Sequence, residues 1–297
     1  MNARALALLA ATAASAIYGL NHSLAKGLMP HVIGPYGFIL LRVSGAALLF
    51  WGISFFYPSE KIEKADGWRI LACAIFGMVL NMNMFFKGLQ LSTPINSSVV
   101  ITLTPVLLLI LSAFLLKERI SWIKVTGIGI GLAGALLLIL FGAEAQPDAP
   151  NIPLGNILFI VNASSYALYL ILVKPLVAKY SSITLMKVFF LLAVVINLPI
   201  GWSQFSEVAW LSLEFDAIWK MIFVVAGTTV LTYLFNIYAL KVLSPSTIGA
   251  FIYLQPVLAT LFAIMLGADK LTPLRIAAAA LIFAGVFLST RKKTQKK

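Results

Sequence analysis

Long apolar segments alternate with short polar connections along the whole chain of 297 residues. An α-helix needs roughly 20 mostly apolar residues to cross a bilayer, and each segment has about that length. The connections are too short to hold a soluble module, so the pattern predicts one all-α membrane domain over residues 1–297. The ten predicted transmembrane helices lie at 4–26, 34–57, 68–90, 95–116, 122–142, 153–176, 182–203, 217–241, 246–267 and 273–290.

The two halves of the chain resemble each other, which predicts an internal repeat. The matched positions are Tyr18 with Tyr166, Trp68 with Trp219, Pro105 with Pro256, and the tetrapeptide at 118–121 with that at 269–272. We therefore predict a first five-helix repeat at 1–146 and a second at 147–297. Because five is odd, the second repeat enters the membrane from the opposite side. This is the inverted-topology arrangement of many secondary transporters.

Composition and charge agree with a membrane protein. Charged residues make up 11% of the chain, against about 25% in soluble domains, which excludes an ordinary soluble enzyme or a disordered chain. The net charge is +12, and most Lys and Arg residues fall on the inner side if both termini are cytoplasmic. The enrichment of Lys and Arg on the cytoplasmic side also explains the basic run at 291–297, so this run does not indicate nucleic-acid binding. The N-terminal apolar run resembles a signal peptide, but it continues past Tyr18, so we expect it to be retained.

Several of these features resemble the EamA-type drug/metabolite transporters over essentially the whole chain. They are the two five-helix halves, the prolines at 105 and 256, the Lys-Glu-Arg-Ile stretch at 117–120, and the Gly-rich span with Gly127, Gly129, Gly131 and Gly134. The resemblance implies a ten-helix transporter with a central cavity between the halves, which carries amino acids or other small metabolites. The glycines are expected to serve close helix packing.

Polar side chains at bilayer depth are costly and usually face the bundle interior or a cavity. Sorting them by helical spacing gives a set of candidate substrate-binding residues. The set is Tyr18, Asn21, His22, Lys26, Arg42, Asn81, Ser98, Thr102, Asn162, Tyr166, Tyr169, Thr232, Tyr233, Asn236, Tyr253 and Gln255. The competing interpretation is that Ser, Thr and Asn bond neighbouring helices, and that Lys26 extends to the membrane surface. Pro105 and Pro256 are predicted to kink their helices and free a backbone carbonyl.

All Asp and Glu residues fall in predicted loops or at helix ends. Proton or sodium coupling commonly uses a carboxylate at bilayer depth, and so does the binding of lipophilic cations. The pattern therefore disfavours a cationic multidrug pump and favours a zwitterionic, neutral or anionic metabolite. Arg42 lies well inside the second predicted span and should have a specific partner.

The function predicted from these patterns is a secondary transporter, favoured as an exporter of amino acids or related metabolites. The alternative is an exchanger of phosphorylated or sugar-nucleotide compounds, which needs basic groups such as His22, Lys26, Arg42 and Lys87 to converge. An enzyme or a signalling scaffold is disfavoured, because the chain has no metal-binding helix, no paired intramembrane aspartates and no soluble partner-binding region. A phosphate-binding loop is also missing, which excludes an ATP-driven pump on this chain.

Partners and location complete the expectations. We expect no cofactor and no metal, and the single Cys73 excludes an internal disulfide. The expected partners are a small-molecule metabolite and the lipid bilayer, with no nucleic acid. We expect a monomer or weak dimer in a bacterial plasma (inner) membrane.

Overall fold

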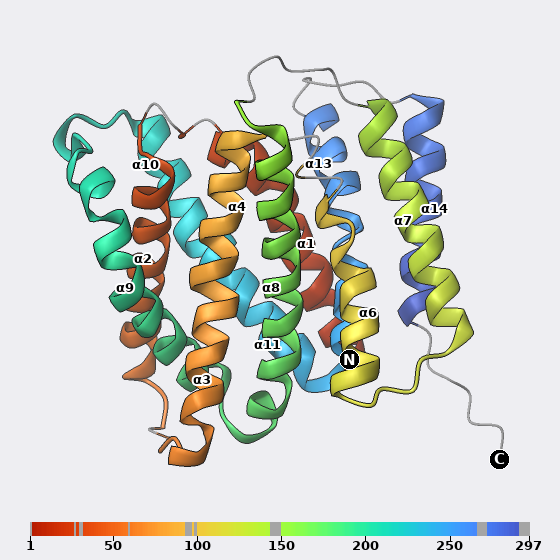
Figure 1. The fold of residues 1–297 in the computed structure, drawn as a ribbon, viewed down its shortest axis with the longest axis horizontal. Helices are drawn as coiled ribbons and strands as arrows, with labels where there is room; N and C mark the ends of the chain where they lie inside the picture. The colour runs from red at the N-terminus through yellow and green to blue at the C-terminus, as the bar shows by residue number, and fades with distance from the viewer. Residues whose placement is uncertain are drawn as a thin grey trace.

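The computed structural model describes residues 2–26, 28–29, 32–58, 60–92, 97, 100–142, 150–265 and 272–290, and it is a helical bundle (Figure 1). In the first half the elements are α1 (Ala3–Lys26), α2 (Pro35–Ser54), η1 (Lys64–Asp66), α3 (Gly67–Ala74), η2 (Ile75–Val79), α4 (Leu80–Leu91), α6 (Thr104–Leu115) and α7 (Trp122–Gly142). In the second half they are α8 (Ile152–Lys179), α9 (Ser182–Ser206), η3 (Trp210–Ser212), α10 (Phe215–Ile222), η4 (Phe223–Leu231), α11 (Thr232–Val242), α12 (Pro245–Phe251), α13 (Leu254–Met265) and α14 (Pro273–Thr290).

These elements confirm the predicted all-α membrane fold of ten transmembrane helices. Six helical stretches are long and apolar enough to cross a membrane, with mean hydropathy between 1.5 and 2.3. The shorter apolar helices Thr104–Leu115, Trp122–Leu137 and Ile276–Thr290 coincide with three further predicted spans. The ninth span is formed by α12 and α13 together.

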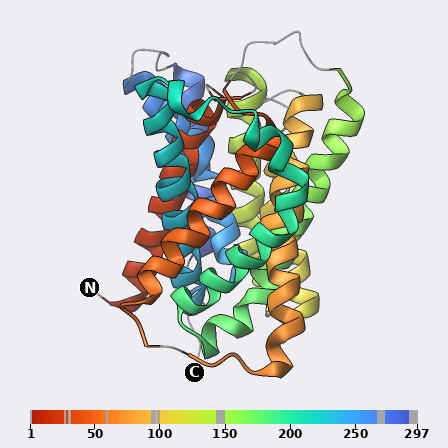
Figure 2. The same ribbon diagram turned by 90° about the vertical axis from the view of Figure 1, so that its left-hand side faces the viewer.

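Helix packing relates the two halves by an approximate two-fold axis. The second helices of the halves, α2 and α9, pack on each other (Figure 2), and so do the last ones, α7 and α14. The first helices exchange partners, because α1 packs on α11 and α13 while α8 packs on α4 and α6. The Arg4 guanidinium donates to the Thr290 carbonyl, so α1 begins and α14 ends on one side of the bundle. That arrangement requires an even number of crossings, as an inverted repeat of five-helix halves provides.

Four of the predicted spans are interrupted where we expected regular helices or simple kinks. The third and eighth spans each contain a π-helical segment, η2 and η4, at equivalent places in the two halves. In the fourth and ninth spans the helix gives way to turns at 102–103 and 252–253. Each turn lies just before a proline, Pro105 or Pro256, whose ring cannot accept a regular preceding helix. The prolines therefore break their helices rather than merely bend them.

The Gly-rich span lies at the contact between α7 and α14. A Cβ atom on Gly285 would lie 2.5 Å from the backbone nitrogen of Gly131 and 2.6 Å from the carbonyl oxygen of Gly127. A Cβ atom on Gly134 would lie 2.9 Å from the Ala278 carbonyl oxygen. The two backbones therefore approach as closely as glycine alone allows. Gly129 is the exception, since a Cβ atom there would meet nothing within 4 Å.

Candidate functional site

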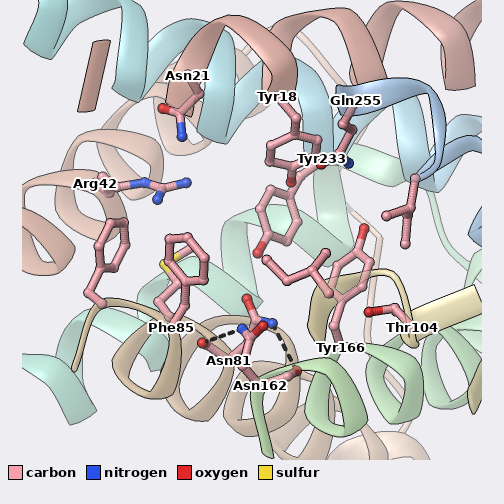
Figure 3. A pocket seen from close by; sticks show the side chains of 14 residues that line it. Tyr18, Asn21, Arg42, Asn81, Phe85, Thr104, Asn162, Tyr166, Tyr233 and Gln255 are labelled. Atoms are coloured by element: carbon pink, nitrogen blue, oxygen red, sulfur yellow. Dashed lines mark hydrogen bonds between the residues drawn. The ribbon is translucent and has the colours of Figure 1, made fainter. Parts of the chain in front are cut away.

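A central cavity lies where the two halves meet. The space open to the centres of water molecules is about 130 Å³. Its lining residues are Tyr18, Asn21, Arg42, Asn81, Met82, Phe85, Phe86, Ile101, Thr104, Asn162, Tyr166, Tyr233, Ile252 and Gln255 (Figure 3). They come from α1, α2, α4, α6, α8, α11, α13 and the two helix breaks. A movement of one half against the other would therefore change its shape and access.

Half of the candidate residues chosen from the sequence line this cavity. They are Tyr18, Asn21, Arg42, Asn81, Asn162, Tyr166, Tyr233 and Gln255. Asn236 lines a smaller neighbouring space of about 20 Å³, and its Nδ2 donates to the Tyr166 hydroxyl at 3.2 Å. The two spaces share Tyr18, Tyr166, Ile252 and Gln255. The repeat-related pair Tyr18 and Tyr166 thus belongs to both.

The structure places four other candidates outside the cavity lining. Tyr169 packs against Gly77 and Tyr253 against Gly131, and both rings are fully buried. Thr232 donates its hydroxyl to the Thr228 carbonyl, and Thr102 is also buried. These residues share helical faces with lining residues, but neighbouring helices cover them.

Three candidates cannot be placed. Ser98 lies outside the described residues. His22 and Lys26 belong to α1, but their side chains also lie outside what the structure describes.

Six lining residues were missed by the sequence analysis, which searched for polar groups on candidate faces. Five of them are apolar or aromatic: Met82, Phe85, Phe86, Ile101 and Ile252. The sixth, Thr104, occupies the repeat position of Gln255, and each directly precedes its half's break-associated proline. The repeat alignment carries the signal that would have found Thr104.

Arg42 is the charged residue among the described residues that line the cavity. Its side chain points into the cavity opposite Tyr18 and Tyr233 (Figure 3), and the residue is 5% exposed. Its Nε donates to the Thr229 hydroxyl at 3.1 Å. The guanidinium carbon lies 5.6 Å from the centre of the Phe86 ring, close enough for a cation–π contact.

Side chains of the second half donate hydrogen bonds to backbone carbonyls of the π-helical segment η2. The Ser165 hydroxyl donates to the Phe76 carbonyl at 2.7 Å, and the Tyr233 hydroxyl donates to the Gly77 carbonyl at 2.9 Å. A π-bulge disturbs the regular pairing of carbonyls along a helix, and at bilayer depth no bulk water replaces the missing donors. These contacts hold the wall of the cavity in place.

Asn81 of α4 and Asn162 of α8 link the third and sixth spans, because each donates a hydrogen bond to the backbone carbonyl of the other. Asn162 Nδ2 donates to the Asn81 carbonyl at 2.8 Å, and Asn81 Nδ2 donates to the Asn162 carbonyl at 3.4 Å. Figure 3 shows the pair at one wall of the cavity. The side-chain nitrogens of both residues donate to backbone carbonyls. Their side-chain oxygens are therefore the atoms that accept hydrogen bonds from a bound molecule.

Comparison with known proteins identifies the family. The profile of the EamA-like transporter family matches this chain twice, at residues 5–140 and 153–291. The chain belongs to the EamA-like transporter family. It is therefore a multi-pass membrane transporter, and its family points away from an enzyme.

Relatives of this EamA-family chain carry transporter names. An uncharacterised transporter of Archaeoglobus fulgidus is 29% identical over 88% of this chain and 90% of its own length. The uncharacterised transporter YetK of Bacillus subtilis is 25% identical over 79% of this chain and 71% of its own length. A WAT1-related protein of Arabidopsis thaliana, At4g28040, is 27% identical over 58% of this chain and 51% of its own. One solved crystal structure shares the fold, with a TM-score of 0.80, 20% identity and 97% of both chains covered.

Two polar clusters join the halves of this EamA-family transporter on one side of the bundle. In the Glu118 cluster, formed by Glu118, Lys124, Ser244 and Ser246, the carboxylate accepts from Ser246 at 2.7 Å and pairs with Lys124. Lys124 also donates to Ser244 at 3.0 Å. Ser244 accepts from the Thr247 amide at the start of α12, so the cluster ties the α6–α7 connection to the ninth span. Asp269, the repeat counterpart of Glu118, lies outside the described residues.

The second cluster joins η1 to the end of α8. In this Asp66 cluster, formed by Glu63, Asp66, Lys179 and Tyr180, Asp66 Oδ2 accepts from Lys179 and from the Tyr180 hydroxyl, each at 2.9 Å. Lys179 also lies 3.4 Å from Glu63. Both clusters lie at the side where α1 begins and α14 ends. In both clusters a carboxylate of the first half accepts hydrogen bonds from side chains of the second half.

Proposed function

We propose that this EamA-family transporter exports small metabolites, amino acids among them, by alternating access at the central cavity. In this proposal the membrane is a bacterial plasma (inner) membrane and both termini are cytoplasmic. The single observation that carries the proposal is a cavity lined by polar and apolar residues of both inverted repeats. A site shared by two halves opens to either side when the halves rock against each other.

The cavity favours small metabolites over phosphorylated or sugar-nucleotide compounds. Among its described lining residues, Arg42 supplies the one positive charge, whereas a phosphate or diphosphate group calls for several converging donors and charges. A space of about 130 Å³ also suits a small metabolite better than a sugar nucleotide. The lining otherwise offers amides, phenols and apolar groups, which suit a small polar molecule with an apolar part.

Transport by purified protein in liposomes tests this proposal. Liposomes loaded with a mixture of radiolabelled amino acids are expected to lose label faster with the protein than without it. Tyr166→Ala should slow this flux about tenfold or more, because the substitution removes a ring that lines the cavity. Tyr238→Ala is the matched control, since Tyr238 is 38% exposed on the bundle surface and should leave the flux unchanged.

Two results of this experiment would contradict the proposal. Flux of sugar phosphates or sugar nucleotides without flux of amino acids would favour the exchanger instead. Equal slowing by Tyr166→Ala and Tyr238→Ala would show that the central cavity is not the transport site.

A further inference from the structure

Arg42 is a buried cation without an acidic partner in the part of the chain that the structure describes. It lies inside α2 at bilayer depth, where an uncompensated charge is costly. The described ion pairs involve other residues, and the described acids lie at the ends of the bundle. Those acids are Glu60, Glu63, Asp66, Glu118, Glu207, Glu214 and Asp216. A counter-charge therefore has to come from outside this described set.

The surroundings of Arg42 fix its orientation without neutralising it. Its Nε bonds Thr229, and Thr229 in turn donates to the Val224 carbonyl within the π-helical segment η4. The rings of Phe38 and Phe86 lie 6.0 and 5.6 Å from the guanidinium carbon. A guanidinium has five N–H donors, and the bond to Thr229 uses one of them. The terminal nitrogens point into the cavity (Figure 3).

A single carboxylate fits this arrangement. The planar fork of an arginine matches the two oxygens of a carboxylate in a bidentate pair. Phe85 and Phe86 lie beside Arg42, with Met82 on the same helix, so one side of the space next to the charge is apolar (Figure 3). No described lining residue is acidic, which leaves a substrate ammonium group with amide oxygens and ring faces as its partners.

We propose that Arg42 is the specificity-determining residue, which binds the single carboxylate of a small organic or amino acid. The apolar part of that substrate contacts Phe85 and Phe86. The inference rests on the proposed transport function and narrows its substrate class to carboxylates. It also makes Thr229 a positioning residue, because its hydroxyl holds the guanidinium in place.

Binding of matched probes to the purified protein tests this assignment. The aromatic probes are phenylalanine, 3-phenylpropionate, phenylalaninamide and phenethylamine, and an aliphatic series pairs each acid with its amide. Calorimetry on the wild-type protein should show binding of acids, with the corresponding amides weaker by about 10- to 100-fold. Phenethylamine, which has no carboxylate, should bind as weakly as the amides.

Variants separate the charge from the shape of Arg42. Arg42→Gln should weaken acid binding by about 10- to 100-fold and leave amide binding unchanged. Arg42→Lys keeps the charge but loses the fork, so acid binding should be intermediate. Arg69→Gln is the control, because Arg69 lies over the Trp68 ring on α3 and does not line the cavity. If Arg42→Gln does not fold, the comparison of acids with amides on the wild-type protein decides.

Equal binding of acids and amides, or no binding of any acid by the wild-type protein, overturns the assignment. Flux measurements keep this outcome apart from a failure of the transport proposal. Flux of neutral metabolites without a preference for acids contradicts the role of Arg42 alone. Acid binding that depends on Arg42, with no flux in liposomes, contradicts the transport proposal alone.

Discussion

Tyr233 and Tyr253 are buried tyrosines of the second half whose hydroxyl groups differ in their surroundings. The Tyr233 hydroxyl donates to the Gly77 carbonyl, and its ring packs edge-on against Phe190 with centroids 5.3 Å apart. The Tyr253 hydroxyl is buried with no hydrogen-bond partner among the described residues. The Tyr233 hydroxyl therefore satisfies a backbone carbonyl of the first half. The cost of burying the Tyr253 hydroxyl is not offset by a hydrogen bond to a described residue.

Removing these two hydroxyls should have different effects on stability. Tyr233→Phe leaves the Gly77 carbonyl without its side-chain donor and should lower stability by about 1–3 kcal/mol. Tyr253→Phe should be neutral or stabilising, because it removes a buried polar atom that lacks a partner. Thermal unfolding of the detergent-purified variants measures the difference. A larger loss for Tyr253→Phe would contradict the assigned hydrogen bonds.

Helical spacing identifies which face of a span carries polar residues, but not which of them meets open space. Tyr166 and Tyr169 lie on one stripe of α8, yet Tyr166 lines the cavity while the Tyr169 ring fills the gap over Gly77. That outcome depends on the glycine of another helix, which no pattern within α8 reveals. Apolar lining residues such as Phe85 carry no signal at all, because an apolar side chain is ordinary in a transmembrane helix.

At the scale of elements, hydropathy predicted the spans closely and missed their irregularities. Predicted spans such as 122–142 and 273–290 coincide with α7 and α14. Hydropathy did not predict the π-helical segments η2 and η4, because one extra residue in a turn does not change the mean hydropathy of the span. The carbonyls of η2 are also paired with partners far away in sequence, such as Ser165 for the Phe76 carbonyl. Local sequence therefore does not determine η2.

The contact between α7 and α14 gives a prediction about glycine. Gly285→Ala places a methyl group against the backbone of Gly131 and Gly127, and backbone atoms inside two helices cannot move aside. We expect a loss of about 1–3 kcal/mol as the helices separate. Gly129→Ala, on the open side of the same helix, should be neutral or slightly stabilising, since alanine favours helix more than glycine does.

Thermal unfolding and size-exclusion profiles of both variants in detergent check this prediction. The matched design controls for the general effect of adding a methyl group to a transmembrane helix. Equal stability of the two variants would show that α7 and α14 do not approach as closely as described.

At the scale of the whole molecule, the Glu118 and Asp66 clusters fasten the two halves together on one side. Alternating access requires these contacts to break when the cavity opens to that side. Burial raises the pKa of Glu118, but hydrogen bonds and charge from Lys124, together with Ser246, outweigh it, so the pKa lies below its usual value. A carboxyl group with a lowered pKa stabilises the fastened state fully above its usual pKa, and this effect is lost as the pH falls from there through the lowered pKa. The contacts of the Glu118 cluster should therefore be equally stable between about pH 6 and 8.

The double substitution Glu118→Gln and Asp66→Asn should favour the state that opens toward the clusters. The substitution Ile252→Cys places a cysteine in the cavity lining, where its labelling reports access to the cavity. The buried Cys73 is replaced by Cys73→Ser in the same protein. An impermeant maleimide added from the cluster side should label it several-fold faster in the double variant than in the parent. The labelling rate of the parent, divided by the rate of the unfolded parent at the same pH to correct for the thiolate fraction, should be the same at about pH 6 and 8.

Asp216→Asn is the control for this experiment, because it breaks an ion pair within α10 and not one between the halves. It should leave the labelling rate unchanged. Unchanged labelling of a folded double variant would mean that helix packing alone holds this side shut. The rigid seams between α2 and α9 and between α7 and α14 would then control opening, and the two clusters would only add to local stability. A rise in labelling caused equally by Asp216→Asn would instead indicate a general loosening of the bundle.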